Sequence, residues 1–150
     1  MNSTSKASLR KILKELFATQ RLACLAISEH KQPHTTLVAF VATHDLKAIL
    51  FATGKSSKKY NNVKANKRVS MLVDNRTNRI KDFNRGTAVT IVGRAEELNA
   101  HLRERYLKLY LKRHPYLNEF AKSENSGLFR INVDNYRIVT RFQRVVELHM

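Results

Sequence analysis

A segment rich in hydroxyls and cations in the middle of the chain has the residue types that bind anions. Ser57 follows Thr53 after three residues, and Lys58 and Lys59 come next. If Ser57 caps a helix, both lysines lie in its first turn, where the helix dipole makes each cation unfavourable by about 0.3–1 kcal/mol. A bound phosphate would reverse that cost, because backbone N–H groups, hydroxyls and ammonium groups would converge on it. The segment indicates a phosphate site; the alternative, that both lysines extend into water, stays open on these residues alone.

Other chemically capable residues lack the spacing that their chemistry needs. Gly54-Lys55-Ser56 is similar to the end of the phosphate loop of nucleotide triphosphatases. Ile49, however, stands where that loop needs its first glycine. The six histidines have no metal-ligand spacing and Cys24 is the only cysteine, so we expect no metal site and no internal disulfide. No residue is identified as catalytic, and any enzymatic chemistry would come from a bound cofactor.

The net charge is strongly positive and unevenly distributed. Lys and Arg number 28 against 12 Asp and Glu, which gives a formal charge of +16. Residues 54–68 contain six cations and no acid, and residues 76–85 add four cations against Asp82. Such a field attracts polyanions, phosphorylated small molecules or an anionic membrane surface, and charge alone does not choose among them. A basic surface that is merely solvated is the remaining alternative.

Hydrophobic spacing and turn residues predict the elements that position this segment. The predicted helices cover about residues 4–18, 58–66 and 99–114. The predicted strands cover about residues 22–28, 35–42, 47–53, 69–74, 87–98, 128–133 and 136–148. A turn is expected at Asp134-Asn135, between the two C-terminal strands within residues 127–149. The connections between the first three strands are too short for crossover helices, so these strands are expected to run antiparallel.

These elements predict an α+β fold dominated by β-structure. About seven strands joined mostly by hairpins, with few helices, favour a closed or partly open antiparallel barrel with flanking helices. We expect residues 1–150 to form one domain. The longest apolar runs are far shorter than the roughly 20 residues of a membrane-spanning helix, so no membrane association is expected. The single cysteine and the lack of a secretory apolar segment predict a cytoplasmic protein.

The sequence also resembles the pyridoxamine 5'-phosphate oxidase-like, FMN-binding split-barrel family over about residues 12–98. The most specific match is the family's phosphate-binding stretch, Thr-x-x-x-Ser-(Arg/Lys)-Lys, which falls on Thr53, Ser57, Lys58 and Lys59. Further matching segments are Gln32-Pro33-His34, Phe51-Ala52-Thr53, Asn62-Val63 and Gly93-Arg94-Ala95-Glu96. The family element therefore coincides with the anion site that the electrostatic argument indicates.

The resemblance implies a six-stranded antiparallel split β-barrel of the Greek-key type. It further implies a homodimeric, flavin-dependent oxidoreductase that holds FMN in a cleft between protomers. The implied cofactor-binding residues are Thr36, Leu37, Val38, Thr53, Ser57, Lys58, Lys59, Asn75 and Arg76. Of these, Asn75 and Arg76 would lie near the flavin ring or ribityl chain. For Phe142 and Gln143, the one role that the resemblance suggests is a contribution to the partner's site.

The sequence departs from the oxidase itself at identifiable positions. Thr36 stands where the oxidase has an arginine that contacts the cofactor phosphate, and Lys58 replaces another arginine. The C-terminal pattern that holds the vitamin's phosphate is missing from residues 136–150. We therefore expect flavin binding without vitamin B6 oxidation. Relatives with this barrel also bind a deazaflavin or haem, so these stay open as ligands, as does a protein that stores or senses flavin without turnover.

A nucleic-acid-binding module is the alternative from a different functional class. The charge of +16 favours it, and so do Tyr60, Phe83 and Tyr110, which lie among basic residues. The sequence contains no recognition motif of the common DNA- or RNA-binding modules. Flavin binding is therefore the leading hypothesis.

Overall fold

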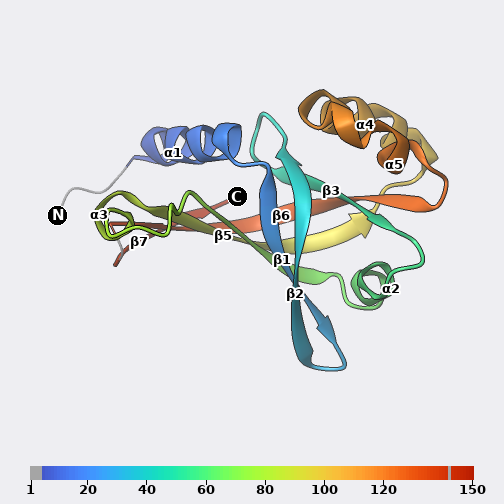
Figure 1. Cartoon of the computed structure of the whole chain (residues 1–150), viewed down its shortest axis with the longest axis horizontal. Coiled ribbons are helices and arrows are strands. Elements are labelled where there is room, and N and C mark those ends of the chain that lie inside the picture. The colour runs from blue at the N-terminus through green and yellow to red at the C-terminus, as the bar shows by residue number, and fades with distance from the viewer. Residues whose placement is uncertain (1–4, 142) are drawn as a thin grey trace.

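A closed antiparallel β-barrel forms the body of the protein (Figure 1). The computed structural model describes residues 5–141 and 143–150. The strands are β1 (Leu22–Glu29), β2 (Gln32–Ala42), β3 (Ala48–Gly54), β4 (Arg68–Asp74), β5 (Thr87–Glu97), β6 (Ser126–Thr140) and β7 (Arg144–His149). Their order is β3-β2-β1-β4-β5-β6, and pairing of β3 with β6 closes the barrel, while β7 extends the sheet beyond β6. The predicted β-dominated six-stranded barrel is confirmed.

The first hairpin shows how local turn chemistry sets the barrel. Glu29 pairs directly with Gln32, so β1 and β2 are joined by the two-residue turn His30-Lys31. Both turn residues have positive φ, 48° and 72°, as the tightest hairpin turns require. The predicted antiparallel run of β1, β2 and β3 is confirmed.

The barrel is split where β2 and β3 part. Their ladder joins Phe40 to Phe51 and ends there, although β3 continues to Gly54 along its other neighbour, β6. Helix α2 (Lys58–Ala65) follows β3, and the chain then returns as β4 on the far side of β1. This crossing over the β1–β2 hairpin gives the Greek-key order. It places the start of α2 near the point where β2 and β3 separate.

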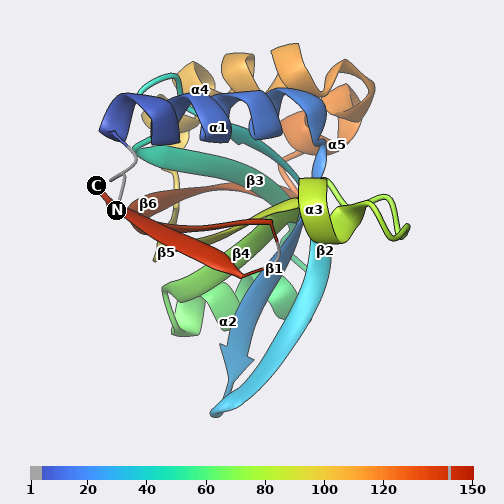
Figure 2. The same cartoon turned by 90° about the vertical axis from the view of Figure 1, so that its left-hand side faces the viewer.

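Two groups of helices cover the barrel (Figures 1 and 2). Helix α1 (Lys6–Thr19) buries Leu9, Leu13, Leu16 and Phe17 in the main core. Helix α4 (Ala100–Arg113), the short 3-10 turn η1 (Pro115–Leu117) and α5 (Asn118–Lys122) lie beside it and cover a second apolar cluster that includes Leu50 and Leu128. Asn99 caps α4 and His114 ends it, as predicted. Within the described residues, no helix is long and apolar enough to cross a membrane.

The turn predicted at Asp134-Asn135 is wrong, because β6 runs through both residues. On β5, Val92 pairs with Asn135 and Gly93 pairs with Val133, so Asp134 is the extra residue of a β-bulge. A side chain at Gly93 would collide with the backbone carbonyl of Asn132, because β6 approaches β5 closely at this bulge. The chain instead reverses after Thr140, which pairs with Arg144.

Candidate functional site

The predicted cap of α2 is confirmed, and it brings the two hydroxyls of the phosphate element together. Ser57 is the N-cap of the helix, and its Oγ accepts the backbone N–H of Tyr60 at 3.2 Å. The Ser57 hydroxyl donates to the carbonyl oxygen of Gly54 at 2.9 Å. Thr53, which is buried, lies with its Oγ1 3.1 Å from Ser57 Oγ. Because the Ser57 proton is used on Gly54, the Thr53 hydroxyl donates to Ser57, and the turn into the helix is fixed.

The two lysines in the first turn of α2 differ in their surroundings. Lys58 is exposed, whereas Lys59 is half-buried, and this burial lowers the pKa of its ammonium group. Neither lysine forms an ion pair with a carboxylate of the described residues, in contrast to Lys64, whose Nζ lies 3.1 Å from Glu97 Oε1. Ser57 caps the backbone N–H of Tyr60, whereas the N–H groups of Lys58 and Lys59 have no acceptor within the helix. A partly desolvated cation beside free N–H donors is an environment that favours a bound anion.

The sequence reasoning missed the residues that hold α2 against the barrel. Tyr60 Oη donates to Glu97 Oε1 of β5 at 2.7 Å, and the Tyr60 and Phe129 rings pack edge to face with 5.6 Å between their centroids. Glu97 lies 37 positions after Tyr60 in the sequence, so no local spacing could reveal the pair.

The three predicted residues of β2 do not share one face. Thr36 and Val38 alternate with Leu37 along the strand, so their side chains point to opposite sides of the sheet. Val38 is buried in the main core, and Thr36 is partly buried opposite Leu25. Leu37 is 66% exposed on the outer face. A ligand on the outer face of the sheet would therefore meet Leu37 and not the buried Val38.

Asn75 and Arg76 lie at the opposite end of β4 from α2, beside the short helix α3 (Asp82–Arg85) (Figure 1). Asn75 Oδ1 accepts the backbone N–H of Thr87 at 2.8 Å, and Arg76 Nε lies 2.7 Å from Asp74 Oδ2. Within this chain, the fold thus brings Thr53, Ser57 and the two lysines together but not Asn75 and Arg76. Of the expected contributions to a partner's site, Phe142 lies outside the described residues.

The aromatic residues that suggested nucleic-acid binding do not form one surface. Tyr110 is buried at 1% exposure, and its Oη donates to the carbonyl oxygen of Ala39. Tyr60 is partly buried and engaged with Glu97. Phe83, at 54%, is the exposed one of the three. This corrects the role expected for Tyr110, because a buried ring cannot stack on a base. The described residues also contain no group of His, Cys, Asp and Glu side chains that could hold a metal ion.

Comparison with solved structures shows the same fold at low sequence identity. A haem-binding protein from Mycobacterium smegmatis aligns with a TM-score of 0.83 and 13% identity, over 99% of this chain and 60% of that one. General stress protein 26 from Bacillus anthracis str. Sterne aligns with a TM-score of 0.67 and 21% identity, over 95% of this chain and 98% of that one. An FAD-binding protein from Mesorhizobium loti aligns with a TM-score of 0.67 and 17% identity, over 90% of this chain and 94% of that one.

The sequence comparisons give the family. The search of curated proteins finds no match. The family model described as pyridoxamine 5'-phosphate oxidase matches residues 9–140, which include all the strands of the closed barrel and the α2 element. This match covers most of the chain, and the barrel is the one that the resemblance implied. The chain therefore belongs to the pyridoxamine 5'-phosphate oxidase family.

Proposed function

We propose that this protein binds FMN and is a flavin-dependent oxidoreductase other than pyridoxamine 5'-phosphate oxidase. The observation that carries the proposal is the start of α2, where Lys59 is half-buried and has no carboxylate partner among the described residues. In the same turn, the backbone N–H groups of Lys58 and Lys59 have no acceptor within the helix. A phosphomonoester supplies the negative charge that this turn lacks. Lys58 adds a second cation from the exposed side.

The residues of the chain fit the phosphate end of FMN better than they fit a catalytic role. Thr53 and Ser57 fix the backbone of the turn, and Lys58 and Lys59 would neutralise the phosphate. FMN itself supplies hydride or electron transfer when it is bound. The protein would hold the cofactor, orient its ring and limit access of water. The substitution of Thr36 for an arginine removes one phosphate contact expected in the oxidase, which supports an activity distinct from vitamin B6 oxidation.

The proposal includes a homodimer with the cofactor between the protomers. An apolar surface on the outer face of β2, β1, β4 and β5 supports it: Leu37, Cys24 and Leu72 are direct cross-strand neighbours. Leu22 at 56% and Leu37 at 66% exposure are the most open members. Val92, at 36%, lies on β5 two residues from Thr90, which pairs with Leu72. Exposed apolar surfaces of this kind mark sites of protein association. A partner would also bring a second copy of Asn75 and Arg76 to the assembly. The single cysteine fits a reducing compartment, and we place the protein in the cytoplasm.

Haem is the competing cofactor, because a haem-binding protein is among the structures with this fold. The visible absorption spectrum of the purified protein separates the two. Flavin bands are expected. A Soret band without flavin bands would show that the bound cofactor is haem and not FMN. A colourless protein that takes up no added FMN would contradict flavin binding. Stopped-flow reoxidation of the reduced holoprotein with candidate acceptors then separates an oxidoreductase from a protein that only stores flavin.

The decisive variant removes both cations of the α2 turn. In Lys58→Ala/Lys59→Ala, loss of two charge-assisted contacts is expected to weaken FMN binding by about a hundredfold or more. Lys108→Ala/Lys112→Ala is the matched control, because it removes the same charge from two exposed positions of α4. Its FMN affinity should stay close to that of the unmodified protein. Equal loss in both double variants would mean that only net charge matters, and the phosphate site would be wrong.

A further inference from the structure

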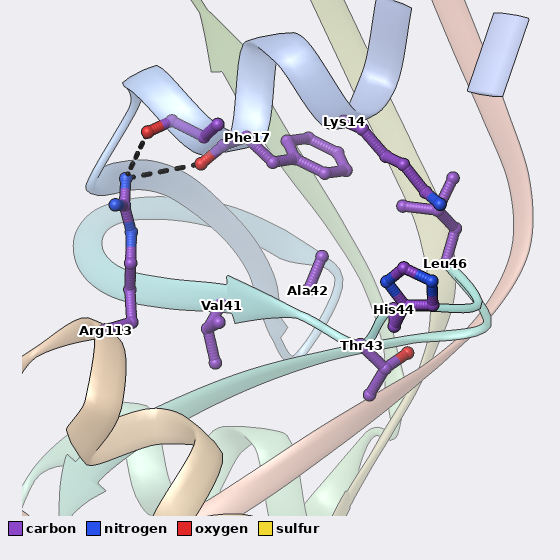
Figure 3. Close-up of a pocket in the computed structure, with 9 residues that line it drawn as sticks. Lys14, Phe17, Val41, Ala42, Thr43, His44, Leu46 and Arg113 are labelled. Atoms are coloured by element: carbon purple, nitrogen blue, oxygen red, sulfur yellow. Dashed lines mark hydrogen bonds between the residues drawn. The ribbon is translucent and has the colours of Figure 1, made fainter. Parts of the chain in front are cut away.

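Helices α1 and α4 lie on the side of the barrel away from α2 (Figures 1 and 2), and a pocket lies between them. It is formed between α1, the turn that joins β2 to β3, and the C-terminal end of α4 (Figure 3). Its volume is about 320 Å³. Small-molecule sites begin at roughly 300 Å³. At about 30 Å³ per water-sized group, the pocket has room for a body on the order of ten non-hydrogen atoms.

The pocket has a firm apolar lining. Phe17 and Ala18 come from α1, Val41 and Ala42 come from β2, and Leu46 comes from the turn. Phe17 and Leu46 are both core residues, with 8% and 1% exposure. The pocket is therefore shaped by packed side chains, and an apolar ligand would find it largely pre-formed.

Basic groups flank this apolar lining at two ends. In Figure 3, Lys14 and His44 lie at one end and Arg113 lies at the other. Among the described residues that line the pocket there is no Asp or Glu. The nearby Asp45 carboxylate is engaged elsewhere, because its Oδ1 accepts the Thr43 hydroxyl at 2.7 Å and the Lys47 backbone N–H at 3.0 Å. The pocket thus combines an apolar body with positive charge that no lining carboxylate neutralises.

The two ends differ in what they can offer a ligand. Arg113 Nη2 donates to the carbonyl oxygens of Ala18 at 3.0 Å, Gln20 at 3.1 Å and Phe17 at 3.3 Å. These contacts hold the guanidinium on the C-terminal end of α1, where the helix dipole favours a cation. Lys14, by contrast, is an exposed side chain that reaches over the pocket beside His44 (Figure 3). An anionic group would accordingly bind at the Lys14 end.

We propose that this pocket binds a small apolar carboxylate, with its carboxylate at Lys14 and His44 and its apolar body against Phe17, Val41 and Leu46. Medium-chain aliphatic acids and simple aromatic acids share this chemistry and this size. The site is separate from the phosphate element of α2, so its occupation does not depend on the proposed flavin function.

The test is an NMR titration of ¹⁵N-labelled protein with octanoate, benzoate and octylammonium. Both acids are compared with octylammonium, which has the apolar chain and the opposite charge. Saturable shifts are expected at the amides of Ala18, Val41 and Ala42 with at least one acid, and the acid that binds more tightly identifies the aliphatic or aromatic class. Absence of saturable shifts with both acids, or equally tight octylammonium binding, would overturn the proposal.

Two variants test the ends of the pocket separately. Lys14→Gln should weaken binding of the preferred acid at least about fivefold, whereas Lys11→Gln, an exposed neighbour on the same helix outside the pocket, should leave it unchanged. Ala18→Phe places a ring in the pocket from an exposed helix position and should abolish binding, while thermal unfolding and FMN binding stay near normal. Equal affinities of Lys14→Gln and Lys11→Gln for the acid would contradict the contact between its carboxylate and Lys14.

Discussion

The Tyr60 hydroxyl on α2 and the Glu97 carboxylate on β5 lie 2.7 Å apart and tie the proposed phosphate-binding turn to the barrel wall. Lys64, one turn further along α2, contacts the same carboxylate oxygen at 3.1 Å. β6 leaves room for the pair at Gly127, where a Cβ would lie 2.7 Å from Glu97 Oε2 and 2.9 Å from Tyr60 Cε2. The placement of Lys58 and Lys59 therefore depends on residues far away in the sequence.

Tyr60→Phe is expected to lower the free energy of unfolding and the FMN affinity together. The variant keeps the ring against Phe129 but loses a hydrogen bond to a charged group, worth on the order of 1 kcal/mol at this partly exposed site. FMN binding should weaken because α2 is held less firmly. Urea unfolding and FMN titration measure the two effects.

A matched tyrosine and a spectroscopic measurement make this prediction specific. Tyr106→Phe loses only a long contact of 3.4 Å with Arg130 and should leave FMN affinity unchanged. The hydrogen bond to Glu97 raises the pKa of Tyr60. In Glu97→Gln, ultraviolet titration should show one tyrosine pKa moved down toward its ordinary value of about 10. An unchanged titration would show that the two groups are not coupled in solution.

Gly93→Ala is expected to destabilise the barrel by about 1–3 kcal/mol. Its Cβ would collide with the backbone carbonyl of Asn132 and with Ile131 Cγ2 at 2.9 Å, and neither a carbonyl nor a packed β-branched side chain can yield easily. Gly54→Ala is the control, since no atom lies within 4 Å of its Cβ position. Urea unfolding should show a loss for Gly93→Ala alone, and similar midpoints would mean that β5 and β6 can separate at the bulge without cost.

Local signals in the sequence determined the parts of the fold that were predicted well. Helix α4 has a side-chain cap at Asn99, basic residues in its last turn and a proline after its end, so its bounds were found. The bulge at Asp134 was mistaken for a turn because Asp and Asn favour turns by local chemistry, whereas pairing with β5 on one side and β7 on the other keeps β6 continuous through them. Helices α3 and α5 have only four and five residues, too short for a periodic pattern.

The same limit applies to the candidate sites. Ser57, Lys58 and Lys59 were found because a cap and a helix dipole act within one turn. The support from Glu97 could not be found in this way, since it is created when α2 packs against β5. The pocket beside Lys14 is lined by residues of α1 and of the end of α4, which are roughly a hundred residues apart in the sequence. It too exists only after folding.

Leu37→Glu should dissociate the proposed homodimer. Leu37 is 66% exposed and lies in the apolar row with Cys24 and Leu72, where a buried carboxylate would be costly in an interface. Size-exclusion chromatography with light scattering should give a monomer of about 17.4 kDa, with reduced FMN affinity if the partner completes the site. Phe120→Glu, on α5 and 43% exposed, should remain dimeric. A monomeric unmodified protein would refute the dimer.

His114 connects the end of α4 to the barrel through a buried neutral ring. It has 0% exposure, and its Nε2 lies 2.7 Å from the carbonyl oxygen of Phe40. The ring therefore donates from Nε2, and Nδ1, 3.2 Å from Tyr116 Oη, accepts from that hydroxyl. Burial lowers the pKa of His114, although the carbonyl of Phe40 opposes this shift.

The lowered pKa predicts a loss of stability in mild acid. Between the ordinary histidine pKa of about 6.5 and the lower value in the folded protein, the unfolded chain binds more protons, so the free energy of unfolding decreases as the pH falls. The slope in this window reaches at most about 1.4 kcal/mol per pH unit. His114→Gln can still donate to the Phe40 carbonyl and should lose this part of the acid sensitivity, while His101→Gln, exposed on α4, should keep it. Urea unfolding between about pH 5 and pH 8 measures the slopes, and identical slopes for both variants would show that another group causes the acid response.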